Sequence, residues 1–350
     1  ENIATAAPPA NTRAAMSQFQ TEERASAAPL ASADAPLDRE RERASFETAE
    51  LTNLLYGGPA AVERGRRLRA MIEKDPVFDR SRLPFMNHTQ LYESALGRAK
   101  HFALLMRKHA LDEADQQTCY AAVDAVLPFD VHRSMFVPTL ATQTTPEQRD
   151  KFLPLARDFR IIGAYAQTEL GHGSNVRGIE TTATYLPATR EFEIHSPTLT
   201  STKWWPGGLG FTATHAIVYA RLVLRGRDLG VHGFLVQLRS LDDHAPLPGV
   251  SLGDIGPKVG FNEIDNGYAR FERVRIPREQ MLMRFASVTE EGEYVAPAAA
   301  QAKLGYLTMV HVRAGLVKQS GSKLARALTI GVRYSAQRRQ GGGEAGGGET

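Results

Sequence analysis

A change in hydrophobic periodicity near Ile161 is the feature that most limits how this chain can fold. From Leu37 to about Arg160, apolar residues recur at helical spacing. Residues 161–283 instead contain short segments that alternate polar and apolar side chains, which is typical of strands. Helical spacing returns after Arg284. The order of helices, strands and helices predicts an α+β fold and disfavours a doubly wound sheet, in which helices would alternate with strands.

Turn residues mark the limits of several elements. Leu51, Leu54 and Leu55 recur at helical spacing before Gly57-Gly58-Pro59, whose proline also lies near the start of a second helical segment. Thr145-Pro146-Glu147 is a typical helix start. Residues 181–185 and 191–195 alternate at period two and are joined by residues 187–190, which predicts a hairpin. Further strands are expected at residues 216–224, 233–238 and 268–276. Without helices between them, these strands predict an antiparallel barrel or sandwich.

These patterns divide the chain into five segments. We expect a disordered or leader segment (1–36), an N-terminal helical domain (37–160), a β-barrel domain (161–283), the start of a C-terminal helical domain (284–340) and a glycine-rich loop (341–350). The first segment is rich in Ala, Pro, Ser and Thr, so it cannot bury enough apolar surface to offset its ordering entropy. A flexible tail and a processed leader both fit that composition.

Composition excludes several classes of protein. The 42 basic and 39 acidic residues leave a net charge of +3, which does not indicate a nucleic-acid partner. Cys119 is the only cysteine, so no internal disulfide can form. No run approaches the ~20 apolar residues that a membrane span needs. Neither HExxH nor paired CxxC nor a Walker loop occurs, so we expect no metal site.

Two segments of the strand region combine glycines with polar or aromatic side chains. Residues 165–175 place Thr168 and Ser174 among glycines, where the backbone can approach a ligand closely. Residues 203–210 contain both tryptophans, Trp204 and Trp205, beside three glycines. A wide ring next to exposed backbone amides suits one face of a flavin, although tryptophans that fill a core and glycines that form turns fit the composition equally.

Together these segments resemble the acyl-CoA oxidases, a branch of the acyl-CoA dehydrogenase superfamily. The resemblance covers roughly Leu37 to Gln340. The strings that carry it are residues 164–173, residues 203–210, Ile255-Gly256-Pro257-Lys258, Glu263-Ile264-Asp265-Asn266-Gly267-Tyr268, Arg275-Ile276-Pro277-Arg278 and Arg333-Tyr334-Ser335-Ala336-Gln337-Arg338. It implies FAD as cofactor and an acyl-CoA dehydrogenase-like architecture: an N-terminal helical domain, a central antiparallel β-barrel domain and the start of a C-terminal helical bundle.

The family motifs imply which residues contact the flavin ring. Gln167 and Thr168 match positions that hydrogen-bond the isoalloxazine. Trp205 matches the tryptophan that lies against the flavin, and Gly207 matches the backbone contact beside it. Glu169 is not expected to act as a base, because its place in the motif implies a structural role.

Other matched positions concern the phosphates and the substrate. Gly173 and Ser174 match positions near the flavin and the phosphate arm of the thioester. Arg313, Gln337 and Arg338 match contacts to the pyrophosphate or adenosine part of FAD, a task that suits a permanently charged, forked guanidinium. Taken alone, Arg338 also fits a solvated basic patch. A helix segment that matches the lining of the acyl-CoA site comprises Lys303, Leu304, Gly305 and Tyr306, although Tyr306 also fits a core position.

The resemblance implies an FAD-dependent acyl-CoA oxidase, which converts fatty acyl-CoA to trans-2-enoyl-CoA, reduces O2 to H2O2 and begins peroxisomal β-oxidation. The family's catalytic glutamate has no match here and is expected beyond Thr350, so no catalytic residue is named. A homodimer in the peroxisome or an equivalent microbody is implied by the family. An acyl-CoA dehydrogenase that uses an electron-transfer flavoprotein, and a flavin- or acyl-CoA-binding protein without catalysis, remain alternatives.

Overall fold

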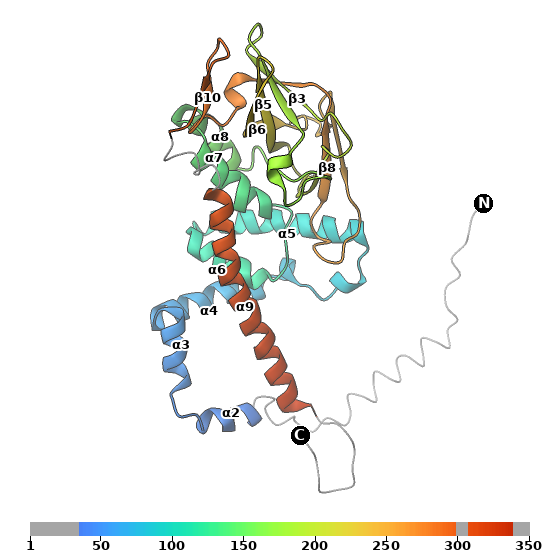
Figure 1. Cartoon of the computed structure of the whole chain (residues 1–350). Helices are drawn as coiled ribbons and strands as arrows, with labels where there is room; N and C mark the ends of the chain where they lie inside the picture. The colour runs from blue at the N-terminus through green and yellow to red at the C-terminus, as the bar shows by residue number, and fades with distance from the viewer. Residues whose placement is uncertain (1–34, 299–306, 339–350) are drawn as a thin grey trace, which may run out of the picture. The chain divides into compact units, whose positions relative to one another are not determined.

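The computed structural model describes residues 35–298 and 307–338 (Figure 1). The expectations for most of the first segment, for the substrate residues 303–306 and for the glycine-rich loop therefore lie outside the described residues. The chain forms two units, one of Glu63–Val317 and one of Glu1–Val62 with Lys318–Thr350.

Helices dominate the described chain up to residue 157. They are α2 (Ala35–Glu42), α3 (Thr48–Tyr56), α4 (Pro59–Glu73), α5 (His88–Lys108), α6 (Glu113–Val123), α7 (Val137–Gln143) and α8 (Pro146–Arg157). Short helical turns are η1 (Pro76–Phe78), η2 (Leu83–Phe85) and the π-helical η3 (His132–Phe136).

Local chemistry sets these helix limits as the sequence predicts. Gly57 ends α3 with a left-handed backbone, φ 86°, which glycine adopts without strain. Pro59 begins α4, where its missing N–H has no helical partner to lose. Thr145 caps α8 by accepting from the backbone N–H of Gln148, whose side chain accepts in return from the backbone N–H of Thr145.

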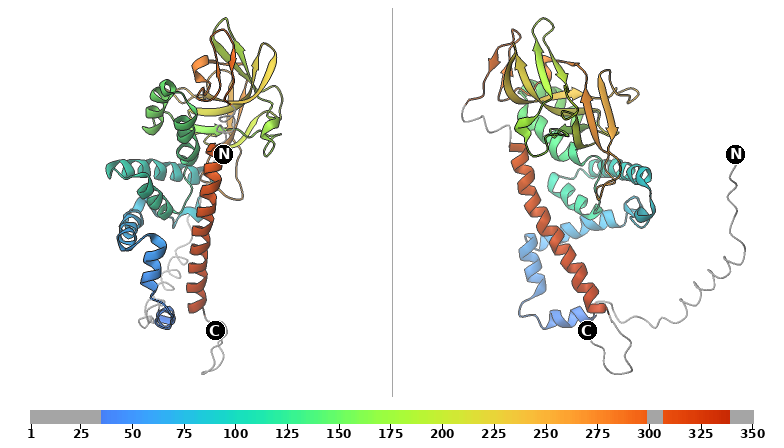
Figure 2. Two further views of the ribbon diagram at one scale, coloured as in Figure 1. Left: turned by 60° about the vertical axis from the view of Figure 1, so that its left-hand side comes forward. Right: turned by 45° about the vertical axis from the view of Figure 1, so that its right-hand side comes forward.

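The strands form two main sheets and a small pair (Figures 1 and 2). One sheet has the order β1-β5-β2-β3-β9, with β6 paired to β5, and another has the order β4-β8-β7. The bounds are β1 (Gly163–Ala166), β2 (Thr182–Leu186), β3 (Glu191–His195), β4 (Lys203–Gly207), β5 (His215–Leu224), β6 (Arg227–Gln237), β7 (Val250–Asp254), β8 (Asn266–Phe271) and β9 (Val274–Pro277).

The predicted hairpin is confirmed, because β2 and β3 pair antiparallel from Thr182 with His195 to Leu186 with Glu191. The expectation of a purely antiparallel sheet is wrong in one respect: β1 and β2 both run parallel to β5. Other strands, β3 and β4, lie between β2 and β5 in the sequence, so the pairing direction of β1 and β2 with β5 is set by non-local packing rather than by a turn.

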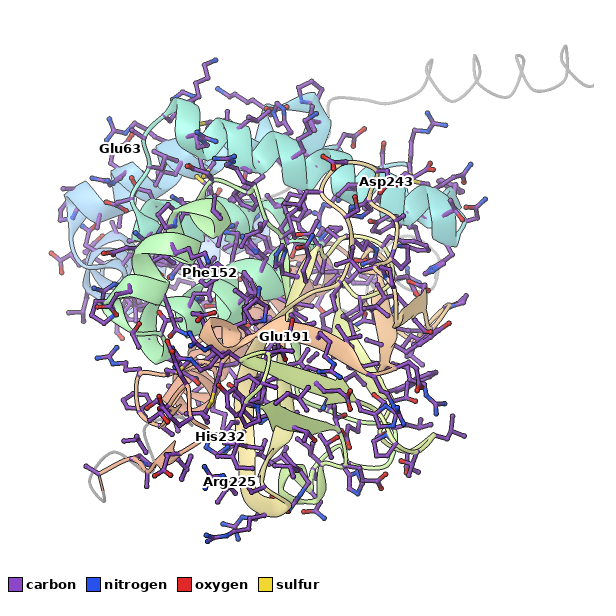
Figure 3. All side chains as sticks on the ribbon, turned by 90° about the horizontal axis from the view of Figure 1, so that it is seen from above. Glu63, Phe152, Glu191, Arg225, His232 and Asp243 are labelled. Carbon is purple, nitrogen blue, oxygen red and sulfur yellow. The ribbon has the colours of Figure 1, made fainter. Side chains whose placement is uncertain are left out.

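Two apolar layers flank the larger sheet. Its inner face contributes Phe192, Ile194, Phe234 and other buried residues to a core that is shared with β7 and β8. On the outer face, residues of η3, α7 and α8 pack against the sheet, as Phe152 of α8 does (Figure 3). Strands β1 and β5 are therefore buried on both faces, whereas β2, β3 and β9 bury one face only.

Gly163 lets η3 approach β1 closely. A Cβ atom at residue 163 would lie 2.1 Å from the Phe136 ring, so only glycine fits there.

The prediction of a helix after Arg284 needs a correction. Residues 287–295 instead form a two-stranded pair, β10 (Ser287–Val288) and β11 (Tyr294–Val295), joined by a turn with Gly292 at φ 80°. The next described helix is α9 (Leu307–Gln337). The apolar spacing that suggested a helix belongs to α9. No helix in the described part of the chain is both long and apolar enough to cross a membrane.

Candidate functional site

The loop after β1 (residues 167–175), called the glycine loop below, lies beside strand β4, which carries Trp204 and Trp205. The Thr168 hydroxyl donates to the Trp204 carbonyl oxygen at 2.8 Å, and the Trp204 backbone N–H donates to the Thr168 carbonyl at 3.1 Å. Leu170 N–H donates to Thr202 O at 2.9 Å, which continues the pairing. Because the Thr168 hydroxyl already donates its hydrogen bond to the Trp204 carbonyl, its oxygen can act only as an acceptor toward a ligand.

The two tryptophans have different surroundings. Trp204 is half-buried and stacks on Tyr268 of β8, with ring centroids 6.1 Å apart and planes at 18°. Trp205 is 53% exposed and adopts a φ of 88°, which is unusual for a residue with a side chain. A register shift in the β4–β8 pairing separates Trp204 from Gly207, and it turns Trp205 outward. Trp204 therefore packs within the domain, whereas Trp205 presents an indole to the surface.

The backbone beyond Trp205 is tightly confined. A Cβ atom at Gly207 would lie 3.1 Å from both Val131 and Ile264. Gly208 has a φ of 87°. Asn266 donates from Nδ2 to the Trp205 carbonyl at 2.8 Å, while its Oδ1 is buried without a hydrogen-bond partner among the described residues. A buried acceptor beside Trp205 thus lacks a hydrogen bond from the described residues.

A buried ion pair lies behind these loops. Glu169 and Lys203 have fully buried side chains, with Lys203 Nζ 3.0 Å from Glu169 Oε1. Burial lowers the pKa of Lys203 to about 8, against the attraction of Glu169, so the ammonium is still charged at neutral pH. Burial alone would raise the pKa of Glu169, but the charge of Lys203 and the hydrogen bonds from Thr181 and Glu180 hold it below its usual value. An ionised carboxylate held in this way is poorly placed to accept a substrate proton, in agreement with the structural role expected for Glu169.

The second half of the loop is open. Gly173 and Ser174 are exposed, and a Cβ atom at Gly173 would meet nothing within 4 Å.

Gln167 is half-buried, and its carbonyl accepts from Lys203 Nζ at 3.4 Å. The structure thus brings the loop residues and β4 together from two separate parts of the chain.

A second polar cluster holds the backbone that follows Gly207. Asp265 accepts from the backbone N–H groups of Phe211 and Thr212, each at 2.7 Å. Arg239 donates to the carbonyls of Leu209, Gly210 and Ala213. Asp265 and Asn266 belong to one of the strings that carried the family resemblance, but the sequence analysis assigned them no role. Apart from that string, the only signal that could have pointed to them was their place at the start of β8, which Asp265 precedes and Asn266 begins.

The predicted residues on and directly after α9 are divided between the two units. Arg313 is exposed on α9, and Gln337 is its last residue. Arg338 donates to the Tyr334 hydroxyl at 2.6 Å, and its guanidinium lies 5.7 Å from the centre of that ring. The unit boundary falls within α9, so the parts of this helix belong to different units. The FAD contacts of these three residues remain predictions.

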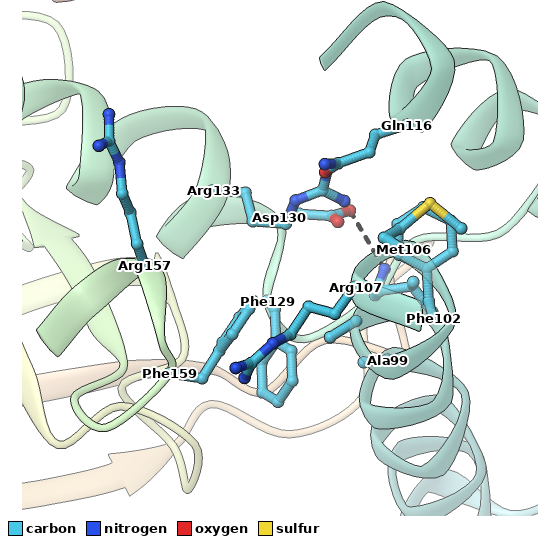
Figure 4. Close-up of a pocket in the computed structure, with 12 residues that line it drawn as sticks. Ala99, Phe102, Met106, Arg107, Gln116, Phe129, Asp130, Arg133, Arg157 and Phe159 are labelled. Carbon is cyan, nitrogen blue, oxygen red and sulfur yellow. Dashed lines mark hydrogen bonds between the residues drawn. The ribbon is translucent and has the colours of Figure 1, made fainter. Parts of the chain in front are cut away.

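A separate pocket of about 140 Å³ lies among the N-terminal helices (Figure 4). Phe129 and Phe159 form part of its wall with ring centroids 5.3 Å apart, and the Arg133 guanidinium lies 5.2 Å from the centre of the Phe102 ring. None of the predicted cofactor residues lines it. This pocket therefore does not contribute to the candidate site.

The described residues fit one edge of a flavin. They offer an exposed indole, a threonine oxygen, an unpartnered amide oxygen and exposed backbone at the glycine loop. This combination of one flat apolar surface and a few polar groups suits a planar heterocycle. Across residues 35–298 and 307–338, no three His, Cys, Asp or Glu side chains are grouped so that they could hold a metal ion.

Comparisons with family models match three consecutive parts of the chain. The model for the acyl-coenzyme A oxidase N-terminal region matches residues 47–162, and the model for the acyl-CoA dehydrogenase middle domain matches residues 164–274. The model for the acyl-CoA oxidase C-alpha1 domain matches residues 306–350.

Similar proteins are acyl-CoA oxidases. The chain is 48% identical to peroxisomal acyl-coenzyme A oxidase 1 of Arabidopsis thaliana over 314 residues, which is 89% of the chain and 47% of that protein. It is 47% identical to the Homo sapiens enzyme of the same name over 307 residues, covering 87% of the chain and 46% of that protein. The chain thus spans about half the length of the curated relatives that it matches.

Solved structures give the same result. The Arabidopsis thaliana acyl-CoA oxidase 1 structure matches with a TM-score of 0.85 and 48% identity, over 90% of this chain and 48% of that one. The structure of acyl-CoA oxidase-2 from Caenorhabditis elegans, bound with FAD, ascaroside-CoA and ATP, matches with a TM-score of 0.81 and 40% identity, over 89% of this chain and 47% of that one. The predicted architecture of helical domain, sheet domain and first C-terminal helix is confirmed by these matches.

Proposed function

The chain belongs to the acyl-CoA oxidase family, and from that premise we propose that it forms the FAD-binding front part of an enzyme that oxidises fatty acyl-CoA with O2. The observation that carries the proposal is the contact between Thr168 and Trp204, which places the glycine loop beside the exposed indole of Trp205. The Caenorhabditis elegans relative was crystallised with FAD, ascaroside-CoA and ATP, which supports FAD and a CoA thioester as ligands here.

In this proposal each residue has a defined task at the flavin. Trp205 covers one face of the ring, because its indole is exposed and held outward by the backbone. Thr168 offers its oxygen, and Gln167 offers its side-chain amide, to the polar edge of the ring. Gly207 provides the backbone contact beside Trp205, and Gly173 with Ser174 receives the phosphate arm of the substrate thioester. Arg313, Gln337 and Arg338 would contact the pyrophosphate or adenosine part of FAD.

The overall reaction converts fatty acyl-CoA and O2 to trans-2-enoyl-CoA and H2O2. When bound, FAD would supply the acceptor for the hydride that leaves the acyl β-carbon, and the route by which the electrons reach oxygen. The chain's residues orient the ring and exclude water from it. No described residue is assigned as the base that takes the α-proton, and Glu169 is unsuitable because Lys203 and four other donors occupy its carboxylate.

Assembly and location are further parts of the proposal. We propose a homodimer in which the FAD site is completed across the subunit interface, and analytical ultracentrifugation of the natural protein tests it. The relatives are named as peroxisomal enzymes, which supports a peroxisomal or microbody location. The names of these relatives do not favour the dehydrogenase alternative or the binding-only alternative.

The first test is FAD binding by the purified chain. We expect a yellow protein, and we expect Trp205→Ala to weaken FAD binding about tenfold, as a stacking contact of 1–3 kcal/mol implies. Leu241→Ala, at another exposed apolar side chain, is the matched control and leaves the affinity unchanged. A colourless wild-type protein that takes up no FAD contradicts the proposal.

The second test concerns the electron acceptor. The natural protein that contains this chain is mixed with a fatty acyl-CoA under air and, separately, without oxygen in the presence of an artificial acceptor. Stoichiometric peroxide under air supports an oxidase. Turnover only with the artificial acceptor indicates a dehydrogenase, and absence of any flavin bleaching indicates a binding protein without catalysis.

A further inference from the structure

The buried Glu169–Lys203 pair connects four segments of the middle domain at one point. Glu169 lies in the loop after β1, and Lys203 is the first residue of β4. Lys203 Nζ donates to Glu169 Oε1 at 3.0 Å, to Tyr219 O of β5 at 2.7 Å and to Gln167 O at 3.4 Å. Its three N–H donors thus have three acceptors, all in the protein.

The carboxylate of Glu169 is satisfied from the other side. It accepts from the backbone N–H groups of Glu180 at 2.8 Å and Thr181 at 3.0 Å, and from the Thr181 hydroxyl. His172 Nδ1 donates to it at 3.2 Å. A buried charge pair is tolerated only when its remaining hydrogen bonds are made, and here they are made by the segment that leads into β2.

These contacts fix both halves of the glycine loop. On the near side, the Lys203 ammonium holds the Gln167 carbonyl, and Lys203 and Glu169 form an isolated β-bridge next to the Thr168–Trp204 pairing. On the far side, Glu169 holds the ring of His172, which directly precedes Gly173 and Ser174. The backbone N–H groups of Glu169 and His172 also donate to each other's carbonyls, at 3.2 and 3.0 Å, which closes the turn.

We infer that Glu169 and Lys203 are positioning residues for FAD: their ion pair holds the glycine loop and β4 at the spacing in which Gln167, Thr168 and Trp205 contact the flavin. This inference rests on the proposed function for its ligand, but not for its geometry. Neither side chain touches the surface, so neither residue meets the cofactor itself. Their effect is transmitted through the backbone of Gln167, Thr168 and Trp204.

Two single variants test the pair in the full chain. Glu169→Gln keeps the size and one acceptor oxygen but removes the charge, and Lys203→Met keeps the length but removes all three donors. Both variants lose thermal stability, because one buried charge or several buried polar groups lose their partner. A positioning role predicts in addition that FAD affinity falls by about tenfold or more, the equivalent of at least one flavin hydrogen bond.

A destabilised control separates positioning from general loss of stability. Ile72 is buried in the N-terminal helical core. Its hydrophobic cluster contains no residue of the glycine loop (167–175) and none of β4. Ile72→Val and Ile72→Ala lower the melting temperature in two steps and define how FAD affinity depends on stability alone. We expect Glu169→Gln and Lys203→Met to bind FAD more weakly than an Ile72 variant of the same melting temperature. If all variants fall on one line, the positioning role is wrong.

Hydrogen exchange provides a measurement that does not involve FAD. The amides of Leu170 and Gly171 donate to Thr202 O and Thr200 O across the two segments. In Glu169→Gln and Lys203→Met, without cofactor, these two amides should exchange faster, whereas in Ile72→Val they should not. Unchanged exchange in the first two variants overturns the inference even if the wild type binds FAD. If the wild type binds no FAD but the exchange pattern is as expected, the proposed function fails while the loop geometry stands.

Discussion

Single buried side chains in this protein show how burial selects a protonation state. His132 is the first residue of η3, and its ring is buried between α8 and β1. Its Nε2 donates to the Ala156 carbonyl of α8 at 3.0 Å, and its Nδ1 accepts from the Gly163 N–H of β1 at 3.0 Å. One ring nitrogen must carry a proton and the other must not, so the fold requires the neutral imidazole. Burial accordingly lowers the pKa of His132 to about 4, from a usual value of 6.5.

This geometry predicts acid sensitivity between pH 6.5 and 4. In that window the unfolded chain binds a proton at His132 and the folded chain does not, so the free energy of unfolding falls as the pH falls, by up to about 1.4 kcal/mol per pH unit. Urea denaturation at pH 7.0 and 4.5 measures the change. His132→Phe should lower stability at pH 7 but reduce the slope, leaving the share of His215, whose pKa burial also lowers to about 4. His109→Asn, at an exposed position, is the control and should leave the slope unchanged. An equal slope in His132→Phe contradicts the prediction.

Arg98 is the opposite case, a buried charge without a matched partner. It is 2% exposed, and its Nη1 and Nη2 have no hydrogen-bond acceptor among the described residues. Only Nε donates, to Ser94 O at 3.4 Å. Burial lowers the pKa of its guanidinium, which reflects the cost of holding a charge there.

We therefore expect Arg98→Met to stabilise the protein. Methionine has a similar length and removes a desolvated charge, so a gain of about 1–3 kcal/mol in the free energy of unfolding is expected. Thermal denaturation measures it, and Arg107→Met on the exposed side of the same helix should change stability by less than about 0.5 kcal/mol. A lower melting temperature for Arg98→Met would indicate that the guanidinium has an acceptor in solution.

At the scale of elements, the three-stranded sheet supports the candidate site. β4 carries Trp205 and Gly207, and β8 pairs with β4 both before and after the register shift between Trp204 and Gly207. Gly267 of β8 lies where the backbone of Gly210 and Gly253 approach: a Cβ atom there would be 2.3 Å from Gly210 N and 2.5 Å from Gly253 O. These are backbone atoms, so no side chain can move aside.

Gly267→Ala should therefore displace the backbone at Gly210, just after β4, and at Gly253 of β7, and cost about 3 kcal/mol or more in stability. Because β4 carries the predicted flavin contacts, we expect FAD affinity to fall as well. Gly260→Ala is the control, since a Cβ atom at that position would meet nothing within 4 Å. The measurement is the melting temperature and FAD affinity of both variants. A Gly267→Ala protein as stable as the wild type would be inconsistent with the close backbone approach.

At the scale of the whole molecule, the sheet and the helices before it share one core. Residues of η3, α7 and α8 pack against Ile217, Leu235 and other residues on the outer face of the larger sheet. Gln148 of α8 also donates to the carbonyls of Glu279 and Met281. The domain boundary predicted at residue 160 therefore lies between two groups of residues that bury each other, and it stays a prediction.

We predict that a fragment of residues 161–283 aggregates or stays unfolded, because its outer apolar face is uncovered. A fragment of residues 124–298 keeps η3, α7 and α8 and should unfold in a single cooperative transition. Circular dichroism and size-exclusion chromatography distinguish the two. If the shorter fragment is monomeric and as cooperative as the longer one, the helices are not required for the fold of the sheet domain.

The sequence by itself determined features that depend on near neighbours in the chain. The left-handed end of α3 at Gly57, the cap of α8 at Thr145 and the β2–β3 hairpin were predictable, because each is decided by a few adjacent residues. The family was also evident from its strings. Only the tertiary structure decided that β1 and β2 run parallel to β5, that Trp204 packs while Trp205 is exposed, and that Glu169 meets Lys203. Those outcomes depend on contacts between residues far apart in the chain, and local periodicity carries no information about such contacts.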